Sequence, residues 1–340
     1  MRRYDIDWIR VIAIGLLIIY HSAVAFQPWG VMIGFITSKE SWLSLWLPMA
    51  VLNVWRIPLL FFVSGMGVYF AMQSRTWIEL ITERTRRIMV PYVFGMFAII
   101  PLQMLIWRYN AGMNLSYVWN PGHLWFLGNI MAYVAIFFVL FYAIRKNGEI
   151  IKKIFSTPFG ILITMAFMMA EALIIKPYPY ELYAMTLHGF FLGLIAFFFG
   201  WVFAFTGIAF WNMITKWWWA LLTIAVTLCY LRLGHGIQYL IPIESVSWVC
   251  LVLILGYKFL NKESNALRYL SEAAYPVYIV HMIFQFLGSM LIFPLNIAVE
   301  IKFVMLVLFT LGGSMLMFQL IKQTNVTRFL FGLRKLKTKS

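Results

Sequence analysis

Histidine and arginine side chains within long apolar segments are the residues of this sequence best suited to do chemistry. Arg10 and His21 lie near the two ends of the first apolar segment. In a helix, the eleven steps between them leave their side chains about 20° apart around the axis and about 16 Å apart along it. Asp7 falls on the same stripe. Because polar groups are costly in hydrocarbon, we expect this stripe to face a protein interior or a water-filled cavity.

The two ends of this stripe suggest different roles. The imidazole of His21 titrates near neutral pH, so it can take a proton from a hydroxyl group. The alternative for His21 is a hydrogen bond that packs one span against another. Arg10 is either an anchor at the membrane surface or a contact to an anionic ligand.

Arg56 lies about halfway through the second apolar segment. A charge at that depth is expensive unless it is paired or hydrated. We therefore expect Arg56 to meet a carboxylate, an array of carbonyl groups or an anionic ligand.

Arg84, Arg86 and Arg87 form a basic cluster before the third apolar segment. The simplest explanation is the excess of basic residues in cytoplasmic loops. The alternative is a phosphate clamp, because guanidinium groups match phosphate oxygens. Arg84 and Arg87 are three residues apart and would lie together if the helix extends through them.

The other histidines differ in position. His123 opens the fourth segment, and His281 lies within the ninth, three residues after Tyr278, so that Tyr278 and His281 can share a helix face. His188 and His235 lie at segment boundaries, where a solvated histidine is expected. The sequence contains no metal-ligand spacing, no glycine-rich phosphate loop and no Gly-x-Ser-x-Gly motif.

These residues must be positioned by membrane-spanning helices. The chain has 340 residues, of which 63% are hydrophobic and 11% charged. Its apolar segments are continuous rather than alternating, which predicts an all-α, polytopic membrane helix bundle. The net charge of +15 is explained by basic cytoplasmic loops, so we expect no nucleic-acid partner. Cys229 and Cys250 lie in apolar segments as fillers.

We predict ten spans, which form a single membrane domain over residues 1–340. Their approximate residue ranges are 7–27, 47–72, 88–107, 123–144, 157–175, 187–207, 214–232, 245–261, 272–292 and 302–322. With the N-terminus inside, the inner segments hold all of the 27 Lys and Arg residues except Lys39, Arg56, Arg108, Lys176, Arg232 and Lys302. This asymmetry predicts that both termini are cytoplasmic.

Both ends of the chain carry features of their own. The basic cytoplasmic tail covers about 323–340, and its end, residues 334–340, should lie solvated near anionic headgroups. The start of the chain is similar to a signal peptide, but Asp5 and Asp7 stand where such a peptide carries positive charge, so we expect no cleavage.

The ordered motifs of the whole chain resemble the acyltransferase 3 family of integral membrane acyltransferases, and within it the group of glucans biosynthesis protein C. The motifs are Asp7-Trp8-Ile9-Arg10 with His21, Arg56 with Phe61-Phe62-Val63-Ser64-Gly65, Arg84-Thr85-Arg86-Arg87 with Pro91, His123-Leu124-Trp125-Phe126-Leu127, and Tyr278-Ile279-Val280-His281.

The resemblance implies a bacterial inner-membrane enzyme that moves an acetyl, succinyl or longer acyl group from cytoplasmic acyl-CoA to a hydroxyl of a glycan or glycolipid. No permanently bound cofactor or metal is expected, because acyl-CoA is a co-substrate. Arg10 and His21 match the family's essential pair, and Arg84 and Arg87 match its coenzyme-binding arginines.

Combined with the chemistry of the side chains, this resemblance assigns further roles. His21 would act as general base or carry the acyl group, and His281 and Tyr278 would orient the acceptor or stabilise the developing oxyanion. Arg10 would assist Arg84 and Arg87 in holding the donor. The remaining candidates for binding substrate or stabilising an oxyanion are Arg56, Ser64 and His123. No extracytoplasmic hydrolase-like domain follows the last predicted span in this sequence, so we expect it to differ from the two-domain members of the family.

Two other classes of protein are compatible with polar residues in a membrane. A transporter or flippase for a glycan or lipid would also need charges at mid-membrane, and would have interrupted helices in two matching halves. A non-catalytic subunit of a polysaccharide assembly machine would use its buried histidines and arginines for folding. Hydrolysis of acyl-CoA separates the enzyme from both.

Overall fold

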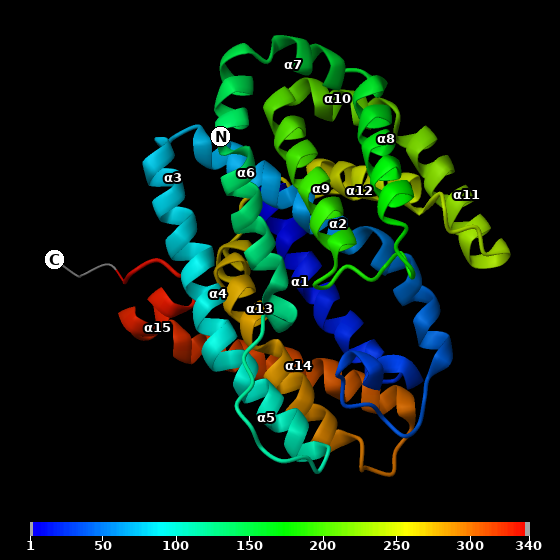
Figure 1. Cartoon of the computed structure of the whole chain (residues 1–340), viewed down its shortest axis with the longest axis vertical. Coiled ribbons are helices and arrows are strands. Elements are labelled where there is room, and N and C mark those ends of the chain that lie inside the picture. Colours follow the sequence, from blue (N-terminus) through cyan, green and yellow to red (C-terminus); the bar gives the residue numbers. More distant parts are fainter. Residues whose placement is uncertain (1–2, 337–340) are drawn as a thin grey trace. The chain divides into compact units, whose positions relative to one another are not determined.

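The structure is a computed structural model that describes residues 3–336. Arg2 of the predicted inner basic group and Lys337 and Lys339 of the predicted tail lie outside the described residues. Within them the chain is helical, with no strand (Figure 1). The α-helices are α1 (Tyr4–Val24), α2 (Trp46–Met72), α3 (Trp77–Arg84), α4 (Val90–Phe94), α5 (Ile100–Asn110), α6 (Trp125–Asn147), α7 (Glu149–Phe155), α8 (Pro158–Ile175), α9 (Leu187–Thr206), α10 (Ile208–Lys216), α11 (Trp218–His235), α12 (Ile241–Leu255), α13 (Asn265–Ile292), α14 (Val299–Ile321) and α15 (Asn325–Leu330).

Short 3-10 and π-helical turns extend several of these helices. The 3-10 turns are η1 (Pro28–Ile33), η2 (Leu43–Leu45) and η5 (Gly122–Leu124), and the π-helical turns are η3 (Thr85–Met89), η4 (Gly95–Ile99) and η6 (Gly256–Leu260).

The predicted all-α, polytopic architecture is confirmed. In the part of the chain that the structure describes, nine helices are long and apolar enough to cross a membrane, and α10 with α11 would make a tenth. Each predicted span overlaps one of these candidates. A membrane favours this outcome because a helix satisfies its own backbone hydrogen bonds in hydrocarbon.

The seventh span departs from the prediction. The predicted range 214–232 crosses a break at Trp217, where α10 and α11 are bent by 62°. The reason is that α10 is amphipathic: it buries Phe210, Trp211 and Ile214 and carries a lysine at its end. The hydropathy of such a segment is the same whether it forms one straight span or two helices joined at an angle.

The third span begins earlier than predicted, because helix α3 precedes it and the arginine cluster lies inside one continuous helical run from Trp77 to Asn110. Each π-turn in this run ends two residues before a proline, Pro91 or Pro101. Proline lacks the N–H that would bond a carbonyl in the preceding turn. The carbonyl of Phe97, four residues before Pro101, accepts a hydrogen bond from the Tyr117 hydroxyl (2.7 Å).

The chain divides into two compact units, each discontinuous in sequence. Unit 1 contains Met1–Arg10, Val51–Thr82 and Asn129–Glu263, and unit 2 contains Val11–Ala50, Glu83–Gly128 and Ser264–Ser340. In unit 1, α9 packs closely on α2: a Cβ at Gly200 would lie 2.0 Å from the carbonyl oxygen of Phe62.

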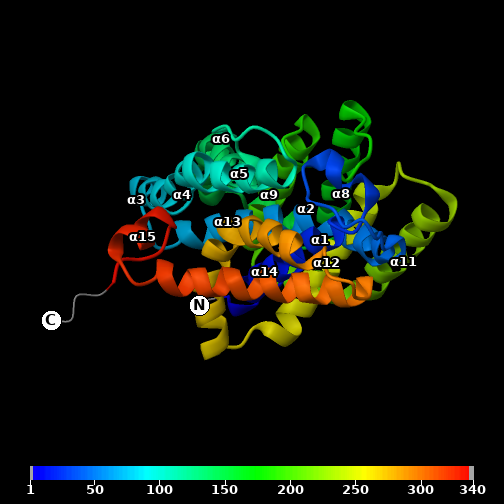
Figure 2. The same ribbon diagram turned by 90° about the horizontal axis from the view of Figure 1, so that it is seen from below.

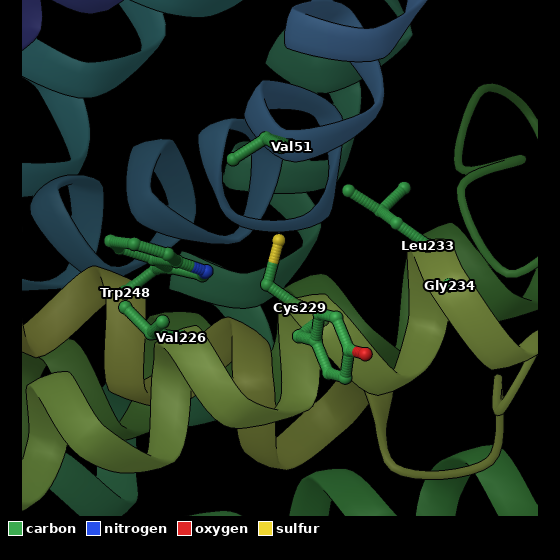
Figure 3. A pocket seen from close by; sticks show the side chains of 7 residues that line it. Val51, Val226, Cys229, Leu233, Gly234 and Trp248 are labelled. Carbon is green, nitrogen blue, oxygen red and sulfur yellow. The ribbon is translucent and has the colours of Figure 1, made fainter.

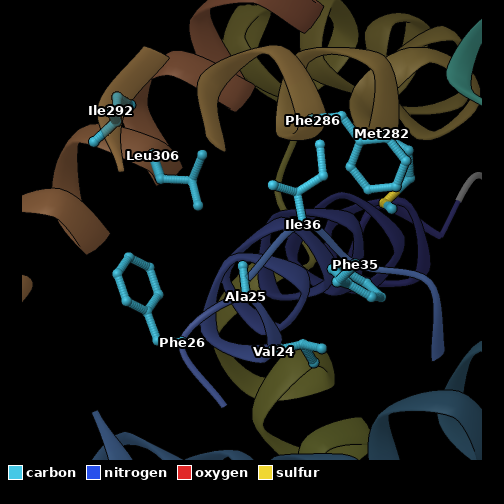
Figure 4. Packing of buried hydrophobic residues seen from close by; sticks show 9 residues of the cluster. All are labelled: Val24, Ala25, Phe26, Phe35, Ile36, Met282, Phe286, Ile292 and Leu306. Atoms are coloured by element: carbon cyan, nitrogen blue, oxygen red, sulfur yellow. The ribbon is translucent and has the colours of Figure 1, made fainter. Parts of the chain in front are cut away.

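In unit 2, helices α13 and α14 lie side by side (Figure 2). A cluster of buried apolar side chains joins the end of α1 and the segment that follows it to these two helices (Figure 4). Its members are Val24, Ala25, Phe26, Phe35, Ile36, Met282, Phe286, Ile292 and Leu306. This cluster fixes the end of α1 that carries His21, whose ring also contacts Phe35 edge-on at 5.5 Å.

Candidate functional site

Two histidines that are 260 residues apart in sequence meet in unit 2. Nδ1 of His21, on α1, lies 2.9 Å from Nε2 of His281, on α13. His281 is fully buried, and the two rings are stacked with centroids 5.1 Å apart. The sequence analysis selected both residues separately, and the structure brings them together.

The hydrogen bonds of His281 determine which ring nitrogens carry protons. Nδ1 of His281 lies 2.7 Å from the main-chain carbonyl of Tyr278, which can only accept, so this nitrogen carries the proton. In a neutral ring, Nε2 of His281 is then the acceptor, and Nδ1 of His21 must donate to it. The lone pair of His21 is therefore on Nε2. A proton taken up at that nitrogen gives an imidazolium whose Nδ1–H is already bonded to His281.

The side chains of His123 and Tyr278 each form a hydrogen bond to the main chain of the other residue. Nε2 of His123 donates to the carbonyls of Tyr278 (3.2 Å) and Ile279 (3.1 Å). In return the Tyr278 hydroxyl donates to the carbonyl of His123. The His123 ring lies edge-on to that of His281, with centroids 4.9 Å apart. Both residues thus fix the carbonyl that orients His281, and the Tyr278 hydroxyl is bonded to backbone.

A polar stripe also follows α13 in unit 2, whereas the sequence analysis placed the organising stripe on α1. Tyr275, Tyr278, His281, Gln285 and Ser289 recur every three or four residues, which places them on one helix face. This spacing was visible in the sequence, but only the Tyr278–His281 step was used.

Gln285 links three helices beside the histidine pair. Its Oε1 accepts from the hydroxyls of Ser22 on α1 (3.0 Å) and Thr310 on α14 (3.2 Å), and its side chain is fully buried. Ser22 follows His21 directly, so the histidine contact and the Ser22–Gln285 bond both hold α1 against α13.

Replacement of Gln285 by leucine should destabilise the protein by about 1–3 kcal/mol, because two buried hydroxyls lose their acceptor. The measurement is the thermal midpoint of unfolding of the purified protein in detergent. Gln103→Leu is the matched control, since Gln103 is also buried in unit 2 and its Oε1 has no hydrogen-bond partner among residues 3–336. That control should be neutral or stabilising. Equal losses in the two variants would contradict the role assigned to the Gln285 bonds.

The arginine cluster lies on the helical run that continues into unit 2. Arg84 ends α3 and Arg87 lies in η3, so the helix extends through both, as the three-residue spacing required. Nε of Arg87 lies 3.3 Å from Oε1 of Glu83, and both side chains are partly exposed. Glu83 is thus a carboxylate partner within this basic cluster.

Three predicted site residues lie in unit 1. Arg10 is 3.6 Å from Asp7, so these two residues of the predicted stripe form an ion pair, and Arg10 packs beside Gly67 of α2. Arg56 is 1% exposed, which is consistent with a charge kept away from hydrocarbon. The hydroxyl of Ser64 donates to the carbonyl of Leu60 at 2.7 Å, one turn earlier in α2.

His188 is not the solvated histidine that its position at a segment boundary predicted. Its side chain is 2% exposed, and Nδ1 lies 2.8 Å from Oε1 of the buried Glu171. Tyr180 and Tyr183 enclose the imidazole, with ring centroids 4.7 and 5.4 Å away. The loop before α9 thus covers a histidine that hydropathy alone places in water.

An open cavity of about 560 Å³ in unit 1 contains none of the predicted site residues (Figure 3). Val51, Val226, Cys229, Tyr230, Leu233, Gly234 and Trp248 line it. Its walls are almost wholly apolar, so we expect hydrocarbon rather than a polar substrate to occupy it.

Together, the apolar helices define a multi-pass membrane protein, and its His21–His281 pair lies partly buried in unit 2. The acyltransferase 3 family model, described as an acyltransferase domain, matches residues 3–319. The chain belongs to this family of membrane acyltransferases, which confirms the resemblance at the level of the family. Searches of curated proteins and of solved structures found no match.

Proposed function

We propose that this protein is an O-acyltransferase that moves an acyl group from cytoplasmic acyl-CoA to a hydroxyl of an extracytoplasmic glycan or glycolipid, with His21 as general base. The observation that carries the proposal is the His21–His281 hydrogen bond. Because the Tyr278 carbonyl fixes the proton on His281, the basic lone pair is on Nε2 of His21.

In this mechanism His21 takes the proton of the acceptor hydroxyl as its oxygen attacks the thioester carbon. The C–S bond of the donor breaks, and the coenzyme thiolate receives the proton back from His21. His281 orients His21 and shares the positive charge of its imidazolium, much as a carboxylate does in a hydrolase triad. Tyr278 positions His281 and His123, and His123 lies close enough to the pair to orient the acceptor.

The arginines would supply the charge complementarity. Arg84 and Arg87 would hold the phosphates of the donor, because guanidinium groups bind phosphate oxygens in pairs. Arg10 would assist them. Arg56 and Ser64 remain candidates for the oxyanion, and Arg56 would also suit the free carboxylate of a succinyl donor.

Membership of the glucans biosynthesis protein C group is the finer part of this proposal. It specifies a bacterial inner-membrane enzyme with both termini in the cytoplasm, a succinyl or acetyl donor and a periplasmic glucan as acceptor. Mass spectrometry of envelope glycans and lipids from cells with and without the gene tests it, because a mass shift identifies both the acyl group and its acceptor. An unchanged glycan profile together with an acylated lipid would overturn the glucan assignment.

Hydrolysis of acyl-CoA by the purified protein in detergent is the direct test of the activity. The enzyme should release free coenzyme A from acetyl-CoA or succinyl-CoA, and faster when an acceptor is added. A transporter or a non-catalytic assembly subunit should release none.

Combined replacement of Arg84 and Arg87 by alanine should weaken coenzyme A binding at least about tenfold, because a hydrogen bond to a charged group contributes about 1.5–3 kcal/mol. Isothermal titration of the purified protein with coenzyme A measures this. The matched control removes two exposed lysines, Lys146 and Lys153, and should leave the affinity unchanged. Equal affinity of the arginine variant and the wild type would contradict the phosphate clamp.

A further inference from the structure

The C-terminal segment 325–336 packs against the rest of unit 2 as far as Leu333, whereas Arg334, Lys335 and Leu336 are exposed. Phe331 and Leu333 are buried, and the Phe331 ring contacts Phe94 of α4 edge-on at 5.4 Å. Arg328 anchors the segment: its guanidinium bonds Oε1 of Glu272 at 2.6 Å and the carbonyls of Arg334 and Lys322. The segment lies beyond residues 3–319, which the family model matches.

A tight turn of this segment rests on the backbone of the arginine cluster. Gly332 has a φ of +71°, and a Cβ at that position would lie 2.6 Å from the carbonyl oxygen of Arg87 and 3.0 Å from Pro91. Only glycine accepts both this backbone conformation and this approach without strain. The turn and η3 therefore form one packed layer.

Arg86 lies at the same junction and has an unused donor. Its guanidinium carbon is 5.8 Å from the centroid of the Phe329 ring of α15. Its Nη2 is buried and has no hydrogen-bond partner among the described residues. A buried guanidinium N–H is costly unless an acceptor completes it, and an anionic oxygen is the strongest acceptor.

Further positive charge enters from the segment. Arg334 and Lys335 are exposed and follow Gly332 by two and three residues, so their Cα atoms lie within about 8 and 11 Å of it. Arg334 and Lys335 join three other cations at this junction, Arg86 and Arg87 of η3 and Arg328. These positive charges outnumber the two carboxylates that form ion pairs there, Glu83 and Glu272. An excess of positive charge of this kind attracts anions.

We propose that the segment 325–336 forms one wall of the donor site, and that Arg86, Arg334 and Lys335 bind phosphate groups of the nucleotide part of acyl-CoA. This inference rests on the proposed function. The phosphate of an anionic lipid headgroup has the same chemistry, and the experiment separates the two sources.

The first test is Gly332→Ala in the full-length protein, with coenzyme A and 3′-phospho-ADP as probes in titration calorimetry. The added methyl group should push the segment away from Arg87 and weaken binding of both probes at least about tenfold, which is about 1.4 kcal/mol. Gly112→Ala is the matched control: Gly112 has a φ of +64°, and nothing lies within 4 Å of its added Cβ. It carries the same backbone strain and should bind coenzyme A like the wild type.

The second test replaces the exposed pair, Arg334 and Lys335, by serine, which leaves the packed residues intact. Coenzyme A binding should weaken about tenfold at low salt, and the difference should shrink as salt screens the charges. Unchanged affinity for both probes in Gly332→Ala and in the serine variant would overturn the inference while leaving the proposed function intact. A wild-type protein that does not bind coenzyme A would overturn both.

Flotation with vesicles that contain phosphatidylglycerol, compared with neutral vesicles, identifies the lipid source. If the serine variant loses only its preference for anionic vesicles and keeps its affinity for coenzyme A, the site serves headgroups and the donor-site inference is wrong.

Discussion

Replacement of His21 by alanine should reduce acyl transfer by the purified protein by about 10²–10⁴-fold, the usual contribution of a general base. The expected loss is in kcat, because the ring transfers protons during the reaction and does not hold the phosphates of the coenzyme. Calorimetric titration should therefore still show coenzyme A binding to the variant. The measurement is release of coenzyme A from radiolabelled acetyl-CoA or succinyl-CoA, with and without acceptor.

His235→Ala is the control for that experiment. His235 is exposed at the end of α11, and its ring contacts only Tyr230 among the described aromatic residues. This variant should transfer at the wild-type rate. Near-normal transfer by His21→Ala would end the assignment of the base, whatever else the histidine pair does for folding.

Replacement of Glu244 by alanine should cost about 3–5 kcal/mol of folding stability, because it leaves a buried guanidinium without its carboxylate. Arg232 donates to both oxygens of Glu244, at 2.7 and 2.9 Å, and the indole of Trp248 donates to the same carboxylate at 3.3 Å. Glu244 is 0% exposed and Arg232 is 8% exposed. The thermal midpoint in detergent, followed by the intrinsic fluorescence of tryptophan, measures the loss.

Two variants check the origin of that effect. Arg232→Met combined with Glu244→Leu removes both charges and should recover most of the stability, because packed apolar residues replace a buried ion pair well. Glu149→Ala removes an exposed ion pair with Lys152 and should leave the midpoint unchanged. A double variant as unstable as Glu244→Ala would show that the stability does not come from the charge pair.

Much of the fold was accessible from the sequence, because the membrane restricts the possible structures. A segment of about 20 apolar residues has to be a helix that satisfies its own backbone, so length and hydropathy predict the spans. The same rule failed at Trp217, because hydropathy carries no information on direction, and two short helices joined at an angle have the composition of one. Hydropathy also gave no indication that Phe331 and Leu333, just before the basic end of the chain, are buried.

The candidate site was predictable in its residues but not in its contacts. His21 and His281 were selected because ionisable groups are costly in a span. Their pairing depends on how helices 260 residues apart pack, and periodicity within one helix cannot specify it. Gln285 was missed because an uncharged amide within a span attracts less notice than a histidine, although it lies one turn from His281. The burial of His188 depends on a loop that folds over it, which no local pattern predicts.

The group that orients His281 is the main-chain carbonyl of Tyr278, and every amino acid retains that oxygen. A deep mutational scan would therefore show the effect of losing either imidazole, but it would not test the carbonyl oxygen that sets their tautomers. Site-specific replacement of the amide that follows Tyr278 by an ester tests this oxygen directly, because the ester carbonyl is a poorer hydrogen-bond acceptor.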